Sequence, residues 1–291
     1  MVRGRRSAGC VRRRVVQRTL RETGKARTLR NLRSLRSRWL LAASLAVVTL
    51  VSGCTVAVGG KAQPAHGLAP RSLAGPTLTR VLLDHDTLSR ILKQPMILDY
   101  RFPPRFGGPE ALQAQRSAAP SECLGVAEML EQAAYHPGTV TSVAVQAWRH
   151  AAVSPALTQV KEGVVSLPTA ADANTLFAAF SQQWQSCAGR TQPLPEDVFR
   201  LKAMIDQVHV AGSVLGASVW LALASSGADA DSIPAGRAIG VRGNCLVEVE
   251  VDFFNASHAS LHGQGVIINS AQDVAQTIMD RIGALVEPTP R

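Results

Sequence analysis

Apolar residues recur along this chain at two spacings, one typical of helices and one typical of strands. The strongest helical pattern begins after Pro168, where Thr169 and Asp172 resemble a capping box. Its apolar face repeats every three or four residues and consists of Leu176, Phe177, Phe180, Trp184 and Cys187. Gly189 follows at a position where glycine commonly ends a helix. This segment therefore predicts a long amphipathic helix.

Three other helices are predicted from shorter patterns. Asp86 is expected to cap a helix that ends near Lys93, and another helix is expected over 123–134. Near the end of the chain, Ser270 and Asp273 form a capping pair in front of an apolar stripe. That stripe consists of Val274, Ile278, Ile282 and Leu285.

Segments in which apolar and β-branched residues alternate with polar ones predict strands. They are Val140–Ala147, Leu157–Leu167, Met204–Ala211, Ser218–Ala224, Arg237–Val241, Cys245–Phe253 and Gly265–Ile268. Arg242–Asn244 is a plausible hairpin turn, and the proline- and glycine-rich stretch 101–119 is expected to be a long loop. The expected fold class is α+β: a single domain with a largely antiparallel sheet, helices packed on one face and a possible cleft.

An apolar run over 40–51 predicts export of the protein. It has about a dozen residues, fewer than the roughly 20 of a membrane-spanning helix, and Arg36 and Arg38 precede it as the basic flank of a signal peptide. The run ends in Val51–Cys54, whose letters Val-Ser-Gly-Cys fit a bacterial lipobox. Cleavage before Cys54 would leave a lipid-modified cysteine at the start of the mature chain. The alternative is an ordinary signal peptide that is cut without lipidation.

This interpretation divides the chain into three parts. Residues 1–53 are a basic leader and signal peptide that cleavage removes, residues 54–76 are a flexible tether, and residues 77–291 are one domain. Residues 1–39 hold thirteen arginines and one lysine against a single acid, Glu22. Because the whole chain has a formal charge of +10, the remainder carries about −3. The positive charge therefore belongs to the leader and does not indicate a nucleic-acid partner.

Three cysteines remain once Cys10 and the lipidated Cys54 are set aside. An exported protein meets an oxidising environment, so at most one bridge can form within the domain, and spacing alone cannot choose the pair. A bridge between Cys123 and Cys187 would close a loop of about 65 residues and stabilise the fold by roughly 3–4 kcal/mol. Cys245 lies in an apolar strand and is expected to be a buried free thiol.

Motif searches identify no catalytic constellation. The nucleophile-elbow, P-loop and His-Glu-x-x-His patterns are all absent from the sequence. Glu248, Glu250 and Asp252 alternate along one strand, where the solvated face of a half-buried strand is favoured over a pair of catalytic carboxylates. His258 and His262 lie in a predicted loop rather than on a metal-binding helix. We therefore expect no catalytic residue, no metal site and no cofactor.

Tryptophans are the candidates for lining an apolar ligand cleft. Trp184 belongs to the apolar face of the long helix and is expected in the core. Trp148 and Trp220 lie on or beside predicted strands, where burial in the core and a place in the lining of a cleft are equally plausible. These two residues are the candidate cleft-lining side chains.

The order of these features resembles the PknH-like extracellular domain, the sensor domain of a mycobacterial transmembrane serine/threonine kinase. That domain also occurs in stand-alone mycobacterial lipoproteins. The similarity runs from about Leu78 to Leu285. Its matching features are Leu78–Leu83, Leu88, Ile91–Leu92, Pro120–Cys123, Trp184–Cys187, Trp220, Arg237–Ile239, Val247–Val251 and the terminal helix.

The resemblance implies a single α+β domain with a cleft for an extracellular ligand, and a bridge between Cys123 and Cys187. A second family bridge flanks the late hairpin, but this chain has no cysteine between Pro234 and Ala238 and none after Val251. The absence of this second bridge predicts a looser hairpin and leaves Cys245 unpaired. This chain also carries no kinase segment of its own.

The leading functional hypothesis is a lipid-anchored cell-envelope protein with a non-catalytic, sensor-like binding domain. Its expected partners are the membrane, through the Cys54 lipid on the extracytoplasmic face, and a small or lipid-like ligand or an envelope protein. One alternative is a scaffold lipoprotein, which would show an exposed apolar patch without a deep pocket. A hydrolase with a non-standard site is the other. It would lose its best candidates if Glu248, Glu250 and Asp252 all lay in open solvent.

Overall fold

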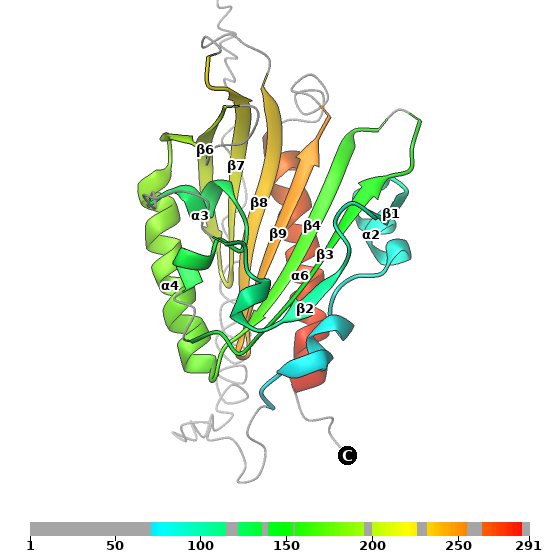
Figure 1. Ribbon diagram of the computed structural model, residues 1–291, viewed down its shortest axis with the longest axis vertical. Helices are drawn as coiled ribbons and strands as arrows, with labels where there is room; N and C mark the ends of the chain where they lie inside the picture. The colour runs from blue at the N-terminus through cyan, green and yellow to red at the C-terminus, as the bar shows by residue number, and fades with distance from the viewer. Residues whose placement is uncertain are drawn as a thin grey trace, which may run out of the picture. The chain divides into compact units, whose positions relative to one another are not determined.

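The computed structural model describes residues 71–114, 122–135, 139–153, 155–194, 200–225, 232–254 and 264–286. These residues form an α+β domain built on a single large sheet (Figure 1). In chain order, with η for a 3₁₀ helix, the elements are η1 (Gly75–Arg80), α2 (His85–Leu92), β1 (Met96–Leu98), β2 (Arg105–Gly107), η2 (Pro109–Ala111), α3 (Leu124–Ala127), η3 (Gln132–Tyr135), β3 (Ser142–His150), β4 (Leu157–Ser166), α4 (Ala170–Cys187), β5 (Thr191–Pro193), β6 (Leu201–Ala211), β7 (Val214–Leu223), β8 (Ile233–Arg242), β9 (Cys245–Phe253) and α6 (Gln264–Val286).

The sheet confirms the predicted antiparallel architecture. In the described part of the chain it has nine strands in the order β1-β3-β4-β9-β8-β7-β6-β5, and β2 pairs with another part of β3. Every ladder between these named strands is antiparallel. The pairing of β4 with β9 joins the hairpin β3–β4 to the later strands, so that residues nearly 100 positions apart become neighbours at the centre of the sheet.

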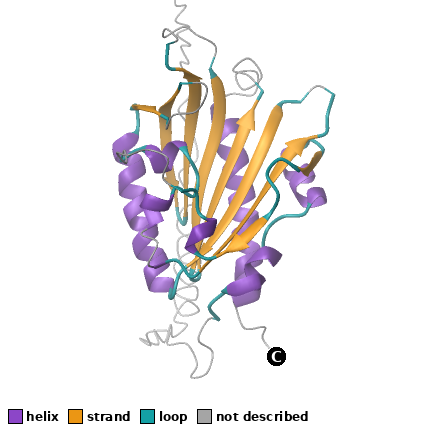
Figure 2. Ribbon diagram, in the orientation of Figure 1, coloured by secondary structure: helices purple, strands orange, loops and turns teal. Residues whose placement is uncertain are grey.

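Helices cover both faces of the sheet, whereas the sequence pattern placed them on one (Figures 1 and 2). In β8, Gly236 and Gly240 face α6, while Ile239 points into the opposite core together with residues of α4. A Cβ on Gly236 would overlap the backbone oxygen of Ile267 in α6, so glycine lets this helix pack directly on the strand. Strand alternation thus leaves two apolar faces, and each is covered by a helix.

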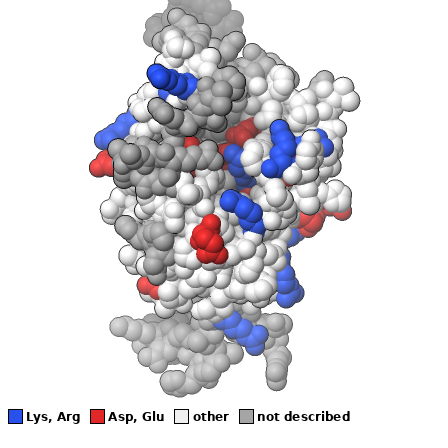
Figure 3. Space-filling model, in the orientation of Figure 1, with Lys and Arg blue, Asp and Glu red and all other residues white. Residues whose placement is uncertain are grey.

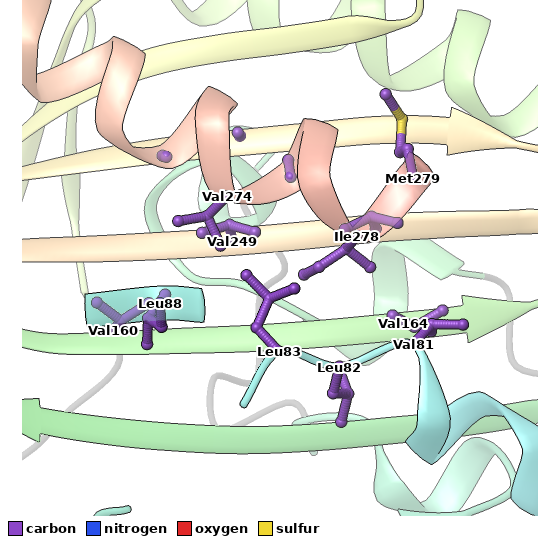
Figure 4. Packing of buried hydrophobic residues seen from close by; sticks show 14 of the residues in the cluster. Val81, Leu82, Leu83, Leu88, Val160, Val164, Val249, Val274, Ile278 and Met279 are labelled. Carbon is purple, nitrogen blue, oxygen red and sulfur yellow. The ribbon is translucent and has the colours of Figure 1, made fainter. Parts of the chain in front are cut away.

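Two hydrophobic cores result. On the α6 face, Leu83 and Leu88 from the N-terminal elements pack with Val274 and Ile278 of α6 against the sheet (Figure 4). Leu73 is also buried in this core, so contacts with the domain begin inside the segment interpreted as a tether. The core on the opposite face is formed by α3, η3 and α4 over the other side of the same strands.

Helix α4 and six of the predicted strands are confirmed, with shifted boundaries. The predicted capping box is present: the Thr169 hydroxyl accepts from the backbone N–H of Asp172, whose carboxylate accepts from the N–H of Thr169. The predicted hairpin turn is also confirmed, with Gly243 at a φ of +58° and Asn244 beside it. Buried Asn244 bonds the backbone of Leu73 and Leu167, so the hairpin end is tied to the rest of the domain.

Five local predictions were wrong. Gly265–Ile268 begins helix α6 instead of forming a strand, so Ser270 and Asp273 lie inside this helix and do not cap it. The cap of α2 is Asp84, not Asp86, because the Asp84 carboxylate accepts from the N–H of Thr87 at 2.9 Å.

The other two concern longer segments. The predicted helix over 123–134 is divided into α3 and η3, and between them Leu130 has a φ of +59° that a continuing helix cannot accommodate. The predicted loop 101–119 contains β2 and η2.

None of the helices within the described ranges combines the length and apolarity that crossing a membrane requires.

A buried carboxylate, Glu162 of β4, lies in the α6-face core. Its Oε2 accepts from the backbone N–H of Leu83 at 2.9 Å and lies 3.4 Å from the side-chain amide of Gln146. Its Oε1 is buried and has no hydrogen-bond partner among the described residues. Burial raises the pKa of Glu162 to about 7, despite the hydrogen bond from Leu83.

We expect Glu162→Gln to flatten the decline of stability between pH 5 and pH 8. Because the folded state raises the pKa of this carboxyl, the folded protein holds the proton more tightly than the unfolded chain does. The contribution of Glu162 to stability is therefore fully present below its ordinary pKa and is lost as pH rises to about 7, by about 3 kcal/mol. Urea unfolding across this pH range measures the change. Parallel profiles for the variant and the parent would contradict the assignment. Asp252→Asn and Glu248→Gln, tested separately, account for the other two carboxyls with a raised pKa.

Candidate functional site

A cluster of charged side chains is buried on the face of the sheet opposite α6. Arg237 of β8 lies directly across the ladder from Glu250 of β9, and Glu248 is two residues away on the same face of β9. Lys161 of β4 pairs with Glu250 from the other side. Tyr135 of η3 covers the cluster from above the sheet. We call these five residues the Arg237 cluster.

Arg237 bridges the two glutamates. Its guanidinium donates to Glu248 Oε2 at 2.8 Å and to Glu250 Oε2 at 3.1 Å, and also to the carbonyl oxygen of Gly125 at 3.2 Å. It lies 5.7 Å from the ring centroid of Trp184, close enough for a cation–π contact. The side chain is fully buried, and its Nε has no partner among the described residues. A buried arginine is tolerated here because hydrogen bonds to two carboxylates and a carbonyl replace those that it would form with water.

The two glutamates have different partners. Glu250 accepts from Lys161 Nζ at 2.6 Å as well as from Arg237, so it is held by two cations. Glu248 accepts from the hydroxyl of Tyr135 and from the backbone N–H of Leu130 at 3.1 Å. This last bond joins the buried carboxylate to the left-handed turn that interrupts the predicted helix.

These surroundings shift the pKa values of the carboxyl groups in different directions. Burial raises the pKa of Glu248 above its usual range, although Arg237 opposes it. Burial acts on Glu250 as well, but Lys161 and Arg237 hold its pKa below the usual range. Burial and the neighbouring Glu250 raise the pKa of Asp252 to about 7. Burial disfavours the charged form of Lys161, but Glu250 and Asp252 raise its pKa to about 12.

The interpretation of Glu248, Glu250 and Asp252 as a solvated strand face was wrong. Glu248 and Glu250 are buried, and Asp252 is partly buried. The strand alternation was correct, but the residues that cover this face come from α3 and η3, far away in sequence. Arg237 and Lys161, which neutralise the glutamates, come from the two neighbouring strands.

A pocket of about 900 Å³ lies over one side of this cluster. Figure 3 shows this face of the molecule, with the side chains of lysine and arginine in blue. Lys161 and Glu250 are the cluster members that reach the pocket. The sheet contributes apolar side chains to it, and the walls come from 101–105, 110–114 and 127–130.

The lining of the pocket combines apolar side chains with six charged ones, Arg101, Arg105, Glu110, Glu128, Lys161 and Glu250. Its apolar members are Phe102, Pro103, Leu112, Ala114, Ala127, Met129, Leu130, Val145, Ala147, Leu194, Val219, Leu221 and Ala235. Among the described lining residues there is no serine, threonine, cysteine or histidine. Lys161 and Glu250 bond each other, so both charges are already neutralised. Such a pocket is suited to binding an apolar or amphiphilic molecule.

Trp148 and Trp220, the predicted cleft-lining residues, do not line this pocket. Val145 and Ala147 of β3 face the pocket, so Trp148 points to the other side, where it is buried in the α6-face core. Val219 and Leu221 of β7 also face the pocket. Trp220, which lies between them in the strand, therefore points to the other side and packs against the α6-face core. Both tryptophans are on strands, but the face that holds the pocket depends on contacts that the sequence pattern does not show.

The disulfide between Cys123 and Cys187 is present and joins the start of α3 to the end of α4. Cys245 is a buried free cysteine, and burial raises the pKa of its thiol to about 12. Cys54, His258 and His262 lie outside the described residues. No group of three or more potential metal-ligating side chains occurs among the residues that the structure describes.

Comparison with known proteins identifies a family and a similar fold. Residues 73–281 match the sequence profile of the PknH-like extracellular domain. The fold is similar to the crystal structure of the extracellular domain of PknH from Mycobacterium tuberculosis, with a TM-score of 0.58 and 17% sequence identity. That likeness covers 74% of this chain and 100% of the other.

A hypothetical protein from Helicobacter pylori gives a TM-score of only 0.22, with 10% identity over 42% of this chain and 85% of the other, which is too low to bear on the fold. No curated protein matches the sequence significantly.

Proposed function

Because the chain belongs to the PknH-like extracellular domain family, we propose that it is a lipid-anchored envelope protein whose domain binds a ligand without catalysis. The observation that carries this proposal is the pocket beside the Arg237 cluster, which has room for a small or lipid-like molecule. The anchor is proposed at Cys54, because the segment Val51–Cys54 fits a lipobox after a short apolar run. The domain would then act on the extracytoplasmic face of the membrane.

The charges of the pocket support binding rather than reaction. A catalytic carboxylate needs a lone pair or a proton that it can exchange with substrate, but both oxygens of Glu250 accept hydrogen bonds from cations. Lys161 in turn is held in its charged form and is not a free nucleophile. Most of the other lining residues are apolar, and four charged ones, Arg101, Arg105, Glu110 and Glu128, stand in the walls, so the binding energy of a ligand would come mainly from buried hydrocarbon.

A ligand in this pocket should raise the melting temperature of the protein. At a ligand concentration 100 times Kd, binding to the folded state adds about 2.7 kcal/mol, which corresponds to roughly 5–10 °C for a domain of this size. We expect this rise with a dodecanoate or lysophosphatidylglycerol probe below its micellar concentration, measured by differential scanning fluorimetry. Envelope glycans are screened in parallel.

Variants locate the binding. Leu221→Trp fills the pocket and should abolish the rise, whereas Met204→Trp, at an exposed position on β6 that does not line the pocket, should retain it. No rise with any lipid or glycan probe, or an equal rise in both variants, would refute binding at the pocket.

A scaffold lipoprotein is the second candidate. It is favoured by the exposed apolar side chains next to β1, among them Leu98 and Phe102. However, a scaffold was expected to show such a patch without a deep pocket, and here the two occur together. A hydrolase is a weaker candidate because Glu248 and Glu250, although shielded from solvent, are committed to Arg237.

A further inference from the structure

The edge of the sheet beside β1 carries a group of aromatic, apolar and arginine side chains, all of them exposed except Arg149, which is partly buried. These residues are Ile97, Tyr100, Arg101, Phe102, Arg105 and Arg149, which we call the edge patch. The first five lie between the start of β1 and β2, and Arg149 is the ladder partner of Ile97 on β3. Residues paired across a ladder share a face of the sheet, so this group surrounds the same edge as the pocket.

The aromatic members are unusually exposed. Tyr100 is 76% exposed and Phe102 is 51% exposed, although the whole chain contains only 13 aromatic residues. Ile97, in the edge strand β1 itself, is 38% exposed. Single exposed apolar residues are common on protein surfaces, but a contiguous group of this kind marks a surface that contacts a partner.

The charges of the edge patch are positive. Asp99 is the only acidic residue between β1 and β2; it is buried and accepts from Arg101 at 2.9 and 2.6 Å. Arg105 and Arg149 form no ion pair with any residue in the described ranges. Arg149 lies 5.5 Å from the ring centroid of Tyr100. Two uncompensated arginines therefore stand beside the exposed rings.

We propose that the edge patch docks onto the surface of an anionic lipid bilayer. Aromatic rings are favoured at the level of the lipid headgroups, because one end of the ring is apolar and the other meets water. Arginine beside them binds phosphate, and each basic side chain near an anionic surface raises the affinity for that surface about fivefold. A soluble acidic polymer would bind to the arginines alone and would leave the aromatic rings exposed to water.

This proposal goes beyond ligand binding, because docking does not require an occupied pocket. Arg101, Phe102 and Arg105 belong to the edge patch and also line the pocket. Docking would therefore place the pocket wall against the bilayer, where a lipid could enter without crossing water.

The test must report on the edge patch itself, because the positive charge of residues 1–39 is expected to attract anionic vesicles as well. In the full chain with Cys10→Ser and Cys54→Ser, Cys123 and Cys187 are bonded and Cys245 is buried, so an added cysteine is the one that reacts. We label Tyr100→Cys with the environment-sensitive fluorophore NBD. The matched control is Met204→Cys, an exposed position on β6 at the far side of the sheet.

With vesicles of equal parts phosphatidylglycerol and phosphatidylcholine, we expect a severalfold rise and a blue shift of NBD emission at position 100 and little change at position 204. Equal responses at both positions, or none at position 100, would overturn the proposal. So would a response to soluble polyglutamate that vesicles do not produce, since the occupant would then be an acidic polymer.

The arginine contribution is measured in the same labelled chain. Arg105→Ser with Arg149→Ser should raise the lipid concentration for half-maximal response at least tenfold, while the melting temperature stays that of the parent. Vesicles of phosphatidylcholine alone should give a weak response. A response as strong as that to the anionic vesicles would overturn the electrostatic part of the proposal.

Discussion

Arg237→Met is expected to lower the free energy of unfolding by about 3–5 kcal/mol, because it leaves two carboxylates in a buried site without their cation. Methionine fills much of the volume of arginine, so the loss measures charge rather than a cavity. Glu248 would then keep only Tyr135 and the N–H of Leu130, and Glu250 would keep only Lys161. Urea unfolding followed by circular dichroism at pH 7 measures the change.

Two comparisons isolate the buried charge. Arg190→Met removes an exposed arginine that lies 3.8 Å from Glu122, and should change stability by less than about 0.5 kcal/mol. The cost of Arg237→Met should also shrink as pH falls, because Arg237 helps to depress the pKa of Glu250. A depressed pKa stabilises the fold above the ordinary pKa of the carboxyl, and this contribution is lost on acidification. A loss below 1 kcal/mol at pH 7, or one that grows toward acid, would contradict this account.

The Arg237 cluster was partly within reach of the sequence. The hairpin turn was predicted over Arg242–Asn244, whereas the structure has a two-residue turn at Gly243 and Asn244. Counting outward from the observed turn places Arg237 opposite Glu250, so a predicted turn shorter by one residue would have shown that this arginine faces a glutamate. The burial of the Arg237 cluster could not be predicted from the sequence, because the residues that cover it belong to α3 and η3, which are distant in the chain.

The errors in the fold have a common physical cause. Periodicity shows that one face of an element is apolar, but it does not show what covers that face. In the sequence, Gly236 and Gly240 make the strand pattern of β8 less clear. In the structure, they mark the place where α6 approaches the strand closely. The start of α6 was predicted as a strand because a short apolar run that contains Ile267 and Ile268 fits both periods. Trp148 and Trp220 were assigned to strands without information on which face holds the pocket.

The disulfide has the second large expected effect. Cys123→Ala together with Cys187→Ala should lower the free energy of unfolding by about 4 kcal/mol, since the bond joins residues separated by 64 positions. It also fixes α3, whose Gly125 accepts from Arg237, to the end of α4. Losing the bond should therefore loosen the cover of the Arg237 cluster, and the amides of 124–130 should exchange hydrogen faster than those of β8.

Reduction distinguishes the bond from the packing of the two side chains. The parent protein in dithiothreitol should unfold at nearly the urea concentration of the double variant, and dithiothreitol should leave the double variant unchanged. Buried Cys245 should stay unmodified by iodoacetamide until the domain unfolds, so it serves as an internal reporter of global opening. If the double variant were within 1 kcal/mol of the parent, the unfolded chain would not gain the freedom that the loop-closure argument assigns to it. The cover of Arg237 would then be held by the core around Tyr135 and Phe180 alone.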